Sequence, residues 1–235
     1  MTELTERGSQ AARGKQVARG RAAGGRGVAA AAIKRALDVL LASAALLVLS
    51  PLLAAIWLAV RLSSPGPGVF SQERLGRGEQ PFTMYKFRSM STGADDAIHR
   101  EYVSRMLTGE GGPVEATNGI YKLHADPRIT PLGASLRKTS LDELPQLVNV
   151  VRGDMSLVGP RPVLAWEAKL FSPQAHARFQ TRPGLTGLWQ VSGRNALTMQ
   201  QALALDVEYV RRQSLWLDLT ILARTLPAQL RRGTA

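Results

Sequence analysis

An uncharged segment of 22 residues, Val39 to Val60, constrains this chain more than any other feature. As a straight helix it would be about 33 Å long, which is enough to cross the hydrocarbon core of a bilayer. Ser50-Pro51 lies at its midpoint, where proline removes one backbone hydrogen bond and the serine hydroxyl can compensate for part of the loss. Basic residues flank both ends, so charge does not assign the ends to opposite sides of a membrane. Two structures stay open: an ordinary kinked spanning helix, and a re-entrant helix that enters and leaves on the cytoplasmic face.

The segments on either side of this stretch set the domain boundaries. Residues 1–32 form a basic tail rich in Gly, Ala and Arg, which we expect to be disordered. This tail lacks the apolar centre of a signal peptide, and its charge could attract it to an anionic membrane surface. Residues 33–62 would then hold the membrane helix, and residues 63–235 a separate domain.

Composition narrows the chemistry. The chain has no cysteine, which excludes disulfides, thiolate zinc sites and a cysteine nucleophile. Its three histidines are scattered without ligand spacing, so any metal should be bound by oxygen ligands, as Mg²⁺ or Mn²⁺ would be. A net charge of +12 indicates anionic partners, whether phosphorylated ligands, nucleic acid or lipid head groups. Composition does not choose among these three.

The adjacent carboxylates of Asp142 and Glu143 stand out in this basic chain, close to Arg137. One reading is structural: Ser140 and Glu143 have the spacing of a capping box. However, Pro145 would then fall in the second turn of the helix, where it breaks a hydrogen bond. If Pro145 instead opens the helix, the two acids lie on an exposed turn before it. Conflicting local signals of this kind are typical of functional sites.

Strands and helices are predicted on both sides of this acidic pair. Val69–Arg74 and Phe82–Met90 read as a β-hairpin, and alternation puts Lys86 and Arg88 on one face, where two cations would suit a diphosphate. Helices are expected at Ala94–Leu107, from Thr130-Pro131 to Arg137 and Lys138, and at Leu144–Val151.

Two stiff turns follow. Gly159-Pro160-Arg161-Pro162 presents Arg161, and the glycine-rich run Arg182–Gln190 leads to Gly193-Arg194; rigid turns can hold cations for phosphate contacts. The leucines between Leu215 and Leu226 recur at helical spacing with Trp216 beside them, which indicates either a core helix or one lying on a membrane surface.

These residues together resemble the bacterial sugar transferases, the monotopic polyprenyl-phosphate phosphoglycosyl transferases that begin exopolysaccharide and glycan assembly. The resemblance extends over residues 33–230, and its order of motifs makes coincidence implausible. Its motifs are Lys34-Arg35 through Asp38, Ser50-Pro51, Tyr85-Lys86-Phe87-Arg88-Ser89-Met90, Asp126-Pro127-Arg128-Ile129-Thr130, Leu136-Arg137, Ser140-Leu141-Asp142-Glu143-Leu144-Pro145-Gln146, Gly153-Asp154-Met155-Ser156, Gly159-Pro160-Arg161-Pro162 and Pro183-Gly184-Leu185-Thr186-Gly187-Leu188-Trp189-Gln190.

The resemblance implies a fold and an activity. The fold would be α/β but mainly helical: a re-entrant membrane helix broken at Ser50-Pro51, joined to a small cytoplasmic catalytic domain with a β-hairpin and surface amphipathic helices. The activity would need Mg²⁺, a nucleoside diphosphate sugar as donor and polyprenyl phosphate as acceptor, at the bacterial inner membrane. The chain is similar to the short form of the family, because longer relatives carry a further multi-span membrane module.

Site roles follow from the resemblance and from the chemistry of the residues. The resemblance implies a catalytic Asp142-Glu143 dyad, and we assign Asp142 as the nucleophile and Glu143 as the metal ligand, since attack on a UDP-sugar by a carboxylate releases UMP and leaves an acyl phosphate. The residues predicted to bind substrate are Lys86, Arg88, Arg128, Arg137, Arg161, Pro162 and Arg194.

Two other classes of protein stay open. A basic membrane-surface or nucleic-acid-binding scaffold would explain the charge but not the acidic pair, whereas a membrane-anchored metal-dependent phosphatase would explain the acidic pair without a lipid substrate. Our preferred reading expects phospholipid and no nucleic acid as partners. The identity of the sugar, the polymer pathway and the oligomeric state stay open, with a homodimer among the possible assemblies.

Overall fold

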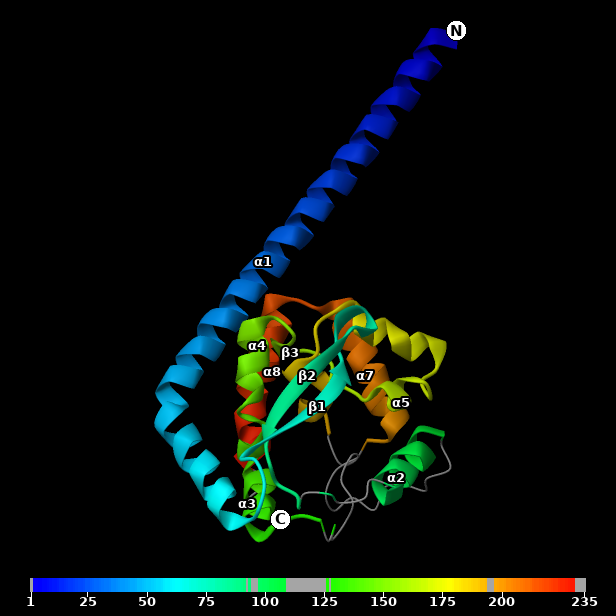
Figure 1. The fold of residues 1–235 in the computed structure, drawn as a ribbon. Coiled ribbons are helices and arrows are strands. Elements are labelled where there is room, and N and C mark those ends of the chain that lie inside the picture. Colours follow the sequence, from blue (N-terminus) through cyan, green and yellow to red (C-terminus); the bar gives the residue numbers. More distant parts are fainter. Residues whose placement is uncertain are drawn as a thin grey trace. The chain divides into compact units, whose positions relative to one another are not determined.

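The computed structural model describes residues 2–91, 93, 97–108, 126, 128–193 and 197–230, with side chains from residue 29 onward except those of residues 98, 99 and 226–230. It is mainly helical, as expected from the sequence, and it has two small sheets, of which the sequence predicts only the β-hairpin (Figure 1). The elements are α1 (Thr2–Ser63), β1 (Val69–Leu75), η1 (Arg77–Glu79), β2 (Pro81–Phe87), α2 (Ala97–Thr108), α3 (Pro131–Thr139), η2 (Leu141–Glu143), α4 (Gln146–Arg152), β3 (Ser156–Val158), α5 (Ala165–Ala168), η3 (Pro173–Gln180), β4 (Gly184–Thr186), α6 (Leu188–Val191), α7 (Met199–Arg212) and α8 (Leu215–Leu230).

Helix α1 continues through Pro51 and bends in its later part (Figure 1). Because proline has no backbone N–H, it cannot bond the carbonyl four residues earlier, which is that of Leu47. The Ser50 hydroxyl donates to this Leu47 carbonyl at 2.8 Å. The predicted role of Ser50 in compensating for Pro51 is therefore confirmed.

The chain divides into two compact units, residues 1–37 and residues 38–235. The predicted disordered tail and the boundaries at residues 32 and 62 stay predictions. Within the second unit, one face of α1 is buried through Ala42, Ile56 and Val60, whereas Leu47 and Val48 on another face are each 76% exposed. Among the described residues, residues 29–63 form one helix that is long and apolar enough to cross a membrane. Only 6% of its most apolar 18-residue stretch is buried.

The predicted hairpin is present as the antiparallel pair β1–β2, in which Phe70 is opposite Lys86 and Arg74 is opposite Phe82. Residues opposite one another share a face of the ribbon, so Arg74 and Lys86 belong to the same face. The Lys86 ammonium lies 5.0 Å from the centre of the Phe70 ring. The second strand ends at Phe87, earlier than predicted, and Met90 forms only an isolated bridge with Ile129.

The second sheet is a short parallel pair, β3 and β4, that holds the predicted Gly159–Pro162 turn in place. The Gly159 N–H donates to the Thr186 carbonyl at 2.9 Å, and the Gly184 N–H donates to the Pro160 carbonyl at 2.8 Å. A Cβ on Gly184 would overlap the Gly159 backbone nitrogen, so both positions require glycine for this close approach. The glycine-rich run from residue 182, predicted as a stiff turn, is therefore partly strand.

The C-terminal helix α8 packs on the rest of the unit through Ile221, which is 1% exposed and lies in a cluster with Val158 and Tyr209. Its other side carries Trp216, which is 79% exposed, and Leu219. The helix thus combines a core face with an exposed apolar face. The buried face agrees with the core-helix alternative, whereas a position on a membrane surface stays a prediction.

Candidate active site

The acidic pair lies on a tight turn between two helices. Helix α3 begins as predicted, with Pro131 in its first turn and the Thr130 hydroxyl accepting from the Gly133 N–H at 3.0 Å. It ends at Ser140, which has the left-handed backbone angles φ 58° and ψ 18°. Asp142 and Glu143 then form the 3₁₀ turn η2, and α4 follows directly after Pro145.

This geometry decides between the two interpretations of the acidic pair. The Ser140 side chain makes no cap hydrogen bond, so the capping box is absent. The second interpretation, in which the two acids lie on a turn before Pro145, is confirmed. The expectation that both acids are exposed is wrong for Asp142, which is 9% exposed, whereas the Glu143 side chain is 33% exposed. The two adjacent carboxylates thus sit in different environments.

Three cations predicted to bind substrate gather around these carboxylates. The Arg161 Nη1 lies 3.9 Å from Glu143 Oε1. Burial and the nearby Arg74 together lower the pKa of Lys86 to about 8, against the opposing charge of Asp142. Burial also lowers the pKa of Arg137, again against the charge of Asp142. The side chains come from β2, from the last turn of α3 and from the turn after β3, so three separate segments bring positive charge to η2.

A buried ion pair holds the Arg161 turn from behind. Arg178 on η3 and Asp206 on α7 have side chains only 1% and 3% exposed, and their Nη2 and Oδ2 atoms are 2.6 Å apart. The same Arg178 Nη2 donates to the Arg161 carbonyl at 2.6 Å, and Asp206 takes part in a backbone hydrogen bond with Arg161. The backbone of Arg161 is therefore fixed while its side chain faces Glu143.

The structure gives Arg88 a different place from the predicted one. Its guanidinium is buried and donates to the carbonyls of Val60 at 3.0 Å, Ser64 at 2.8 Å and Pro65. The alternation that put Arg88 beside Lys86 fails because β2 ends at the residue between them. The prediction that Arg88 contacts a phosphate has no support from this geometry.

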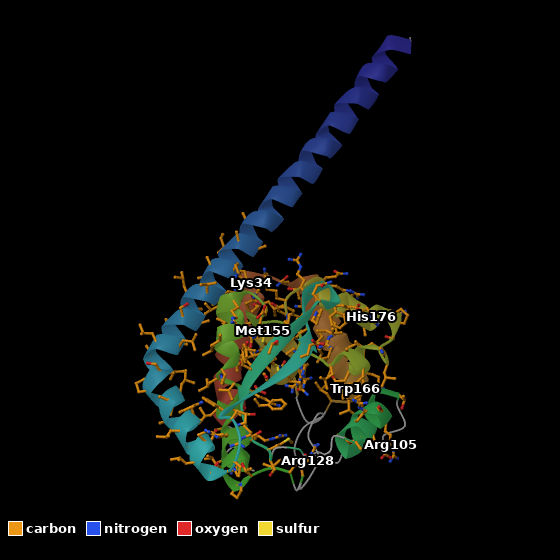
Figure 2. The ribbon with its side chains drawn as sticks, in the orientation of Figure 1. Lys34, Arg105, Arg128, Met155, Trp166 and His176 are labelled. Atoms are coloured by element: carbon orange, nitrogen blue, oxygen red, sulfur yellow. The ribbon has the colours of Figure 1, made fainter. Side chains whose placement is uncertain are left out.

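The remaining predicted residues have mixed outcomes. Arg128, marked in Figure 2, makes a two-pronged ion pair with Asp126 through Nε and Nη2, each at 2.8 Å, and its carbonyl accepts from the Ser91 N–H just after β2. Pro162 is buried and its carbonyl accepts from Arg74 Nη1 at 3.5 Å. Arg194 lies outside the described residues. The substrate-binding roles of Arg128, Pro162 and Arg194 stay predictions.

Sequence reasoning missed Arg74. This half-buried residue of β1 exerts the largest charge effect on Lys86 and also contacts Gln72 at 2.7 Å. The signal was available, because an antiparallel hairpin closed around residues 76–80 puts residues 74 and 86 on one face.

The carboxylates of η2 fit an Mg²⁺ site of the kind that substrate completes. Mg²⁺ usually keeps several waters and binds one or two protein carboxylates together with substrate phosphates. The partly exposed Glu143 and the neighbouring cations provide such a carboxylate beside a place for phosphates. Within the described part of the chain, no cluster of three or more acidic or histidine side chains could hold a metal by itself.

A family model and several relatives identify the family of this chain. The model described as "Bacterial sugar transferase" matches residues 29–232. The chain belongs to the bacterial sugar transferase family. This sugar transferase is 44% identical over 202 residues to the exopolysaccharide production protein ExoY of Rhizobium meliloti, covering 86% of this chain and 87% of that protein.

Two further relatives carry more specific names. The sugar transferase is 42% identical to the UDP-glucose:undecaprenyl-phosphate glucose-1-phosphate transferase of Caulobacter vibrioides, covering 86% of this chain and 71% of that protein. It is 39% identical to the undecaprenyl-phosphate galactose phosphotransferase of Salmonella typhimurium, covering 86% of this chain but only 41% of that longer protein.

Proposed function

We propose that this sugar transferase moves a sugar-1-phosphate from a UDP-sugar to a polyprenyl phosphate at a membrane surface and releases UMP. The observation that carries the proposal is the η2 turn, which sets Asp142 and Glu143 against Lys86, Arg137 and Arg161. The names of the relatives supply the substrate class, since two of them are undecaprenyl-phosphate glucose or galactose phosphotransferases. Initiation of an exopolysaccharide is the corresponding role in the cell, as the name of ExoY suggests.

The cations have the first task. Donor and acceptor both carry phosphate charge, so neither can approach a carboxylate until that charge is screened. Arg161 and Arg137 present planar guanidinium groups that can contact phosphate oxygens through two bonds, and Lys86 adds a compact charge from the hairpin. Because they come from three different segments, they can surround a diphosphate rather than touch it from one side.

Asp142 is the nucleophile of the proposal. One of its carboxylate oxygens attacks the phosphorus that carries the sugar, and the bond from that phosphorus to the bridging oxygen breaks, so UMP leaves with the bonding electrons. A phosphate oxygen of the polyprenyl phosphate then attacks the same phosphorus. The bond to Asp142 breaks, which regenerates the carboxylate and gives a polyprenyl diphosphate sugar.

Glu143 is the proposed Mg²⁺ ligand. It is more exposed than Asp142 and lies beside Arg161, where donor phosphates would complete the coordination. The bound ion would supply further screening of the phosphate charge.

The proposed membrane arrangement is a re-entrant α1 with the catalytic unit on the cytoplasmic face of the inner membrane. The bend, Pro51 and the exposed apolar side chains of α1 support it. Because the chain has no cysteine, single cysteines at Ser9 and Thr234 can be labelled without background. Both should resist an impermeant thiol reagent in intact cells and react once the inner membrane is opened. Labelling at Ser9 alone from the periplasm would show an ordinary spanning helix.

The activity is tested with the full chain in lipid particles, Mg²⁺, polyprenyl phosphate and a panel of UDP-sugars. Release of UMP identifies the active donor, and intact mass measured before the acceptor is added detects the sugar-phosphate adduct. Asp142→Asn should lose both signals, whereas the matched control Glu208→Gln, which alters a surface ion pair on α7, should keep them. Full turnover by Asp142→Asn would refute the covalent assignment.

A further inference from the structure

Helix α1 carries a buried carboxylate at the start of its apolar segment. Asp38 is 6% exposed, and its two oxygens accept from the Ser156 hydroxyl at 2.7 Å and from the Leu157 N–H at 3.1 Å. Burial of a charge is costly unless the charge is well hydrogen-bonded. A membrane anchor alone would not need this contact with β3, which lies more than a hundred residues later in the sequence.

Arg88 holds the other end of the same helix. Its buried guanidinium donates to the carbonyl of Val60 in the last turn of α1 and to the carbonyls of Ser64 and Pro65 just after the helix, where the backbone carbonyls have no i+4 N–H donor. A cation also suits the negative end of a helix dipole. The contact ties the end of α1 to the residue that follows β2.

Both contacts lie next to residues of the site. Arg88 is two positions after Lys86, and Ser156 begins the strand that leads into the Arg161 turn. The hydroxyl of Tyr209, buried behind this strand, lies 3.0 Å from the carbonyl oxygen of Val158 and 2.7 Å from Asp218 Oδ1, so β3 has a packed neighbour on a second side as well.

The apolar face of α1 between these contacts supports the rest of the site. Ile56 and Val60 pack in one cluster with residues that are sequence neighbours of the site residues. These neighbours are Phe87 beside Lys86, Leu136 beside Arg137, and Leu141 and Leu144 on either side of the acidic pair. The polar groups of Lys86, Arg137 and the acidic pair are thus each one residue from a side chain in the cluster that includes α1.

We propose that Asp38 and Arg88 are positioning residues, which couple the seating of α1 to the placement of the cations and of η2. The proposal rests on the proposed function, in that the positioned groups bind donor phosphates. In this proposal, α1 supports the residues of the site by packing against them, in addition to its proposed role in the membrane. The proposal also reverses a simple electrostatic expectation: removing the negative charge of Asp38 should weaken the binding of an anion, because the Arg161 turn loses its support.

The test is a double-mutant cycle on Asp38 and Ser156, with UMP as the probe and the full chain in lipid particles. Asp38→Ala should lower UMP affinity by about tenfold, and Ser156→Ala should cost less in the Asp38→Ala background than alone, because the contact between the two residues is already lost. Flotation with vesicles should not change. Asp38→Asn, which keeps the shape of the side chain, is the variant to use if Asp38→Ala does not fold.

Arg88→Met is the second arm, with Arg61→Met as its matched control. Arg61 is an exposed cation at the same helix end, and within the described residues it donates to the nearby Gly66 carbonyl at 2.7 Å. Arg88→Met should lose UMP affinity and turnover, whereas Arg61→Met should stay within about twofold of the unaltered chain.

Each outcome bears on the proposal. Folded Asp38 and Arg88 variants that bind UMP as tightly as the unaltered chain would overturn it, as would additive losses in the cycle. An increase in UMP affinity on removing Asp38 would also overturn the proposal. It would show that the negative charge of Asp38 affects UMP more than its positioning of the Arg161 turn does. Failure of the unaltered chain to bind UMP or release it from any UDP-sugar would instead refute the proposed function.

Discussion

Lys86 should make donor binding depend on pH. Its pKa is lowered to about 8 by burial and by the neighbouring Arg74, with Asp142 acting in the opposite direction. The ammonium is therefore mostly present at neutral pH and is lost as the pH rises through about 8. A phosphate bound beside it favours the charged form, so binding and protonation assist each other. The affinity for a phosphate ligand should fall as the pH rises above this value.

The size of the effect follows from the shift. A bound phosphate could return the pKa of Lys86 from about 8 to its ordinary value of 10.5. The affinity for the phosphate ligand can then differ by at most about 300-fold between fully protonated and fully deprotonated Lys86. At a pH one unit above the midpoint, about one lysine in eleven is protonated, so the affinity should be about tenfold weaker than at neutral pH.

The assay is calorimetric titration with UMP from about pH 7 to pH 9.5, a range in which its phosphate, with a second pKa near 6, stays fully ionised. Lys86→Arg keeps its charge throughout and should show an almost flat profile, whereas Lys86→Met should bind weakly at every pH. The reasoning fails if the unaltered chain shows no weakening across this range, or if Lys86→Arg weakens with the same midpoint.

Three further predictions follow from other contacts. Excess EDTA should stop transfer, and Mg²⁺ or Mn²⁺ should restore it, while Glu143→Gln should lower the rate and weaken the response to metal; full activity in EDTA would remove the metal from the mechanism. Thr130→Ala removes the α3 cap and should lower the free energy of unfolding by about 1 kcal/mol in a denaturant titration, with the exposed Thr108→Ala as control. Arg178→Leu leaves the buried Asp206 carboxylate without its ion-pair partner and should lower the free energy of unfolding by about 3–5 kcal/mol. The double variant Arg178→Leu with Asp206→Leu should recover stability but not UMP affinity. UMP affinity equal to that of the unaltered chain in the double variant would show that the pair does not position Arg161.

The features that the sequence predicted correctly are those set by near neighbours. The start of α3 depends on Thr130 and Pro131 together, and the repair of the proline break depends on the hydroxyl of Ser50 beside it. The turn that carries the acidic pair follows from the position of Pro145. In each case the partner lies within four residues, so local rules are sufficient.

The features that the sequence did not reveal depend on distant partners. Arg88 meets carbonyls 23 to 28 residues earlier in the chain, and Asp38 meets a serine 118 residues later. Nothing in the local pattern distinguishes an arginine that binds phosphate from one that caps a helix, because the same guanidinium suits both. Only the tertiary arrangement decides between them, and it also buries Asp142, which a turn position alone would expose.

The crowding of positive charge explains why this site contains an acidic pair at all. Lys86 and Arg137 both have lowered pKa values, which shows that their charges are held where burial disfavours them, and the charge of Asp142 opposes the shift at each. Without a carboxylate between them, the cations would repel one another in the free enzyme. The Asp142 carboxylate offsets this repulsion between Lys86 and Arg137, and a bound diphosphate can then neutralise the same cations. In the proposed mechanism, the carboxylate that balances these cations before the donor binds then lies among the phosphates, where a nucleophile must be.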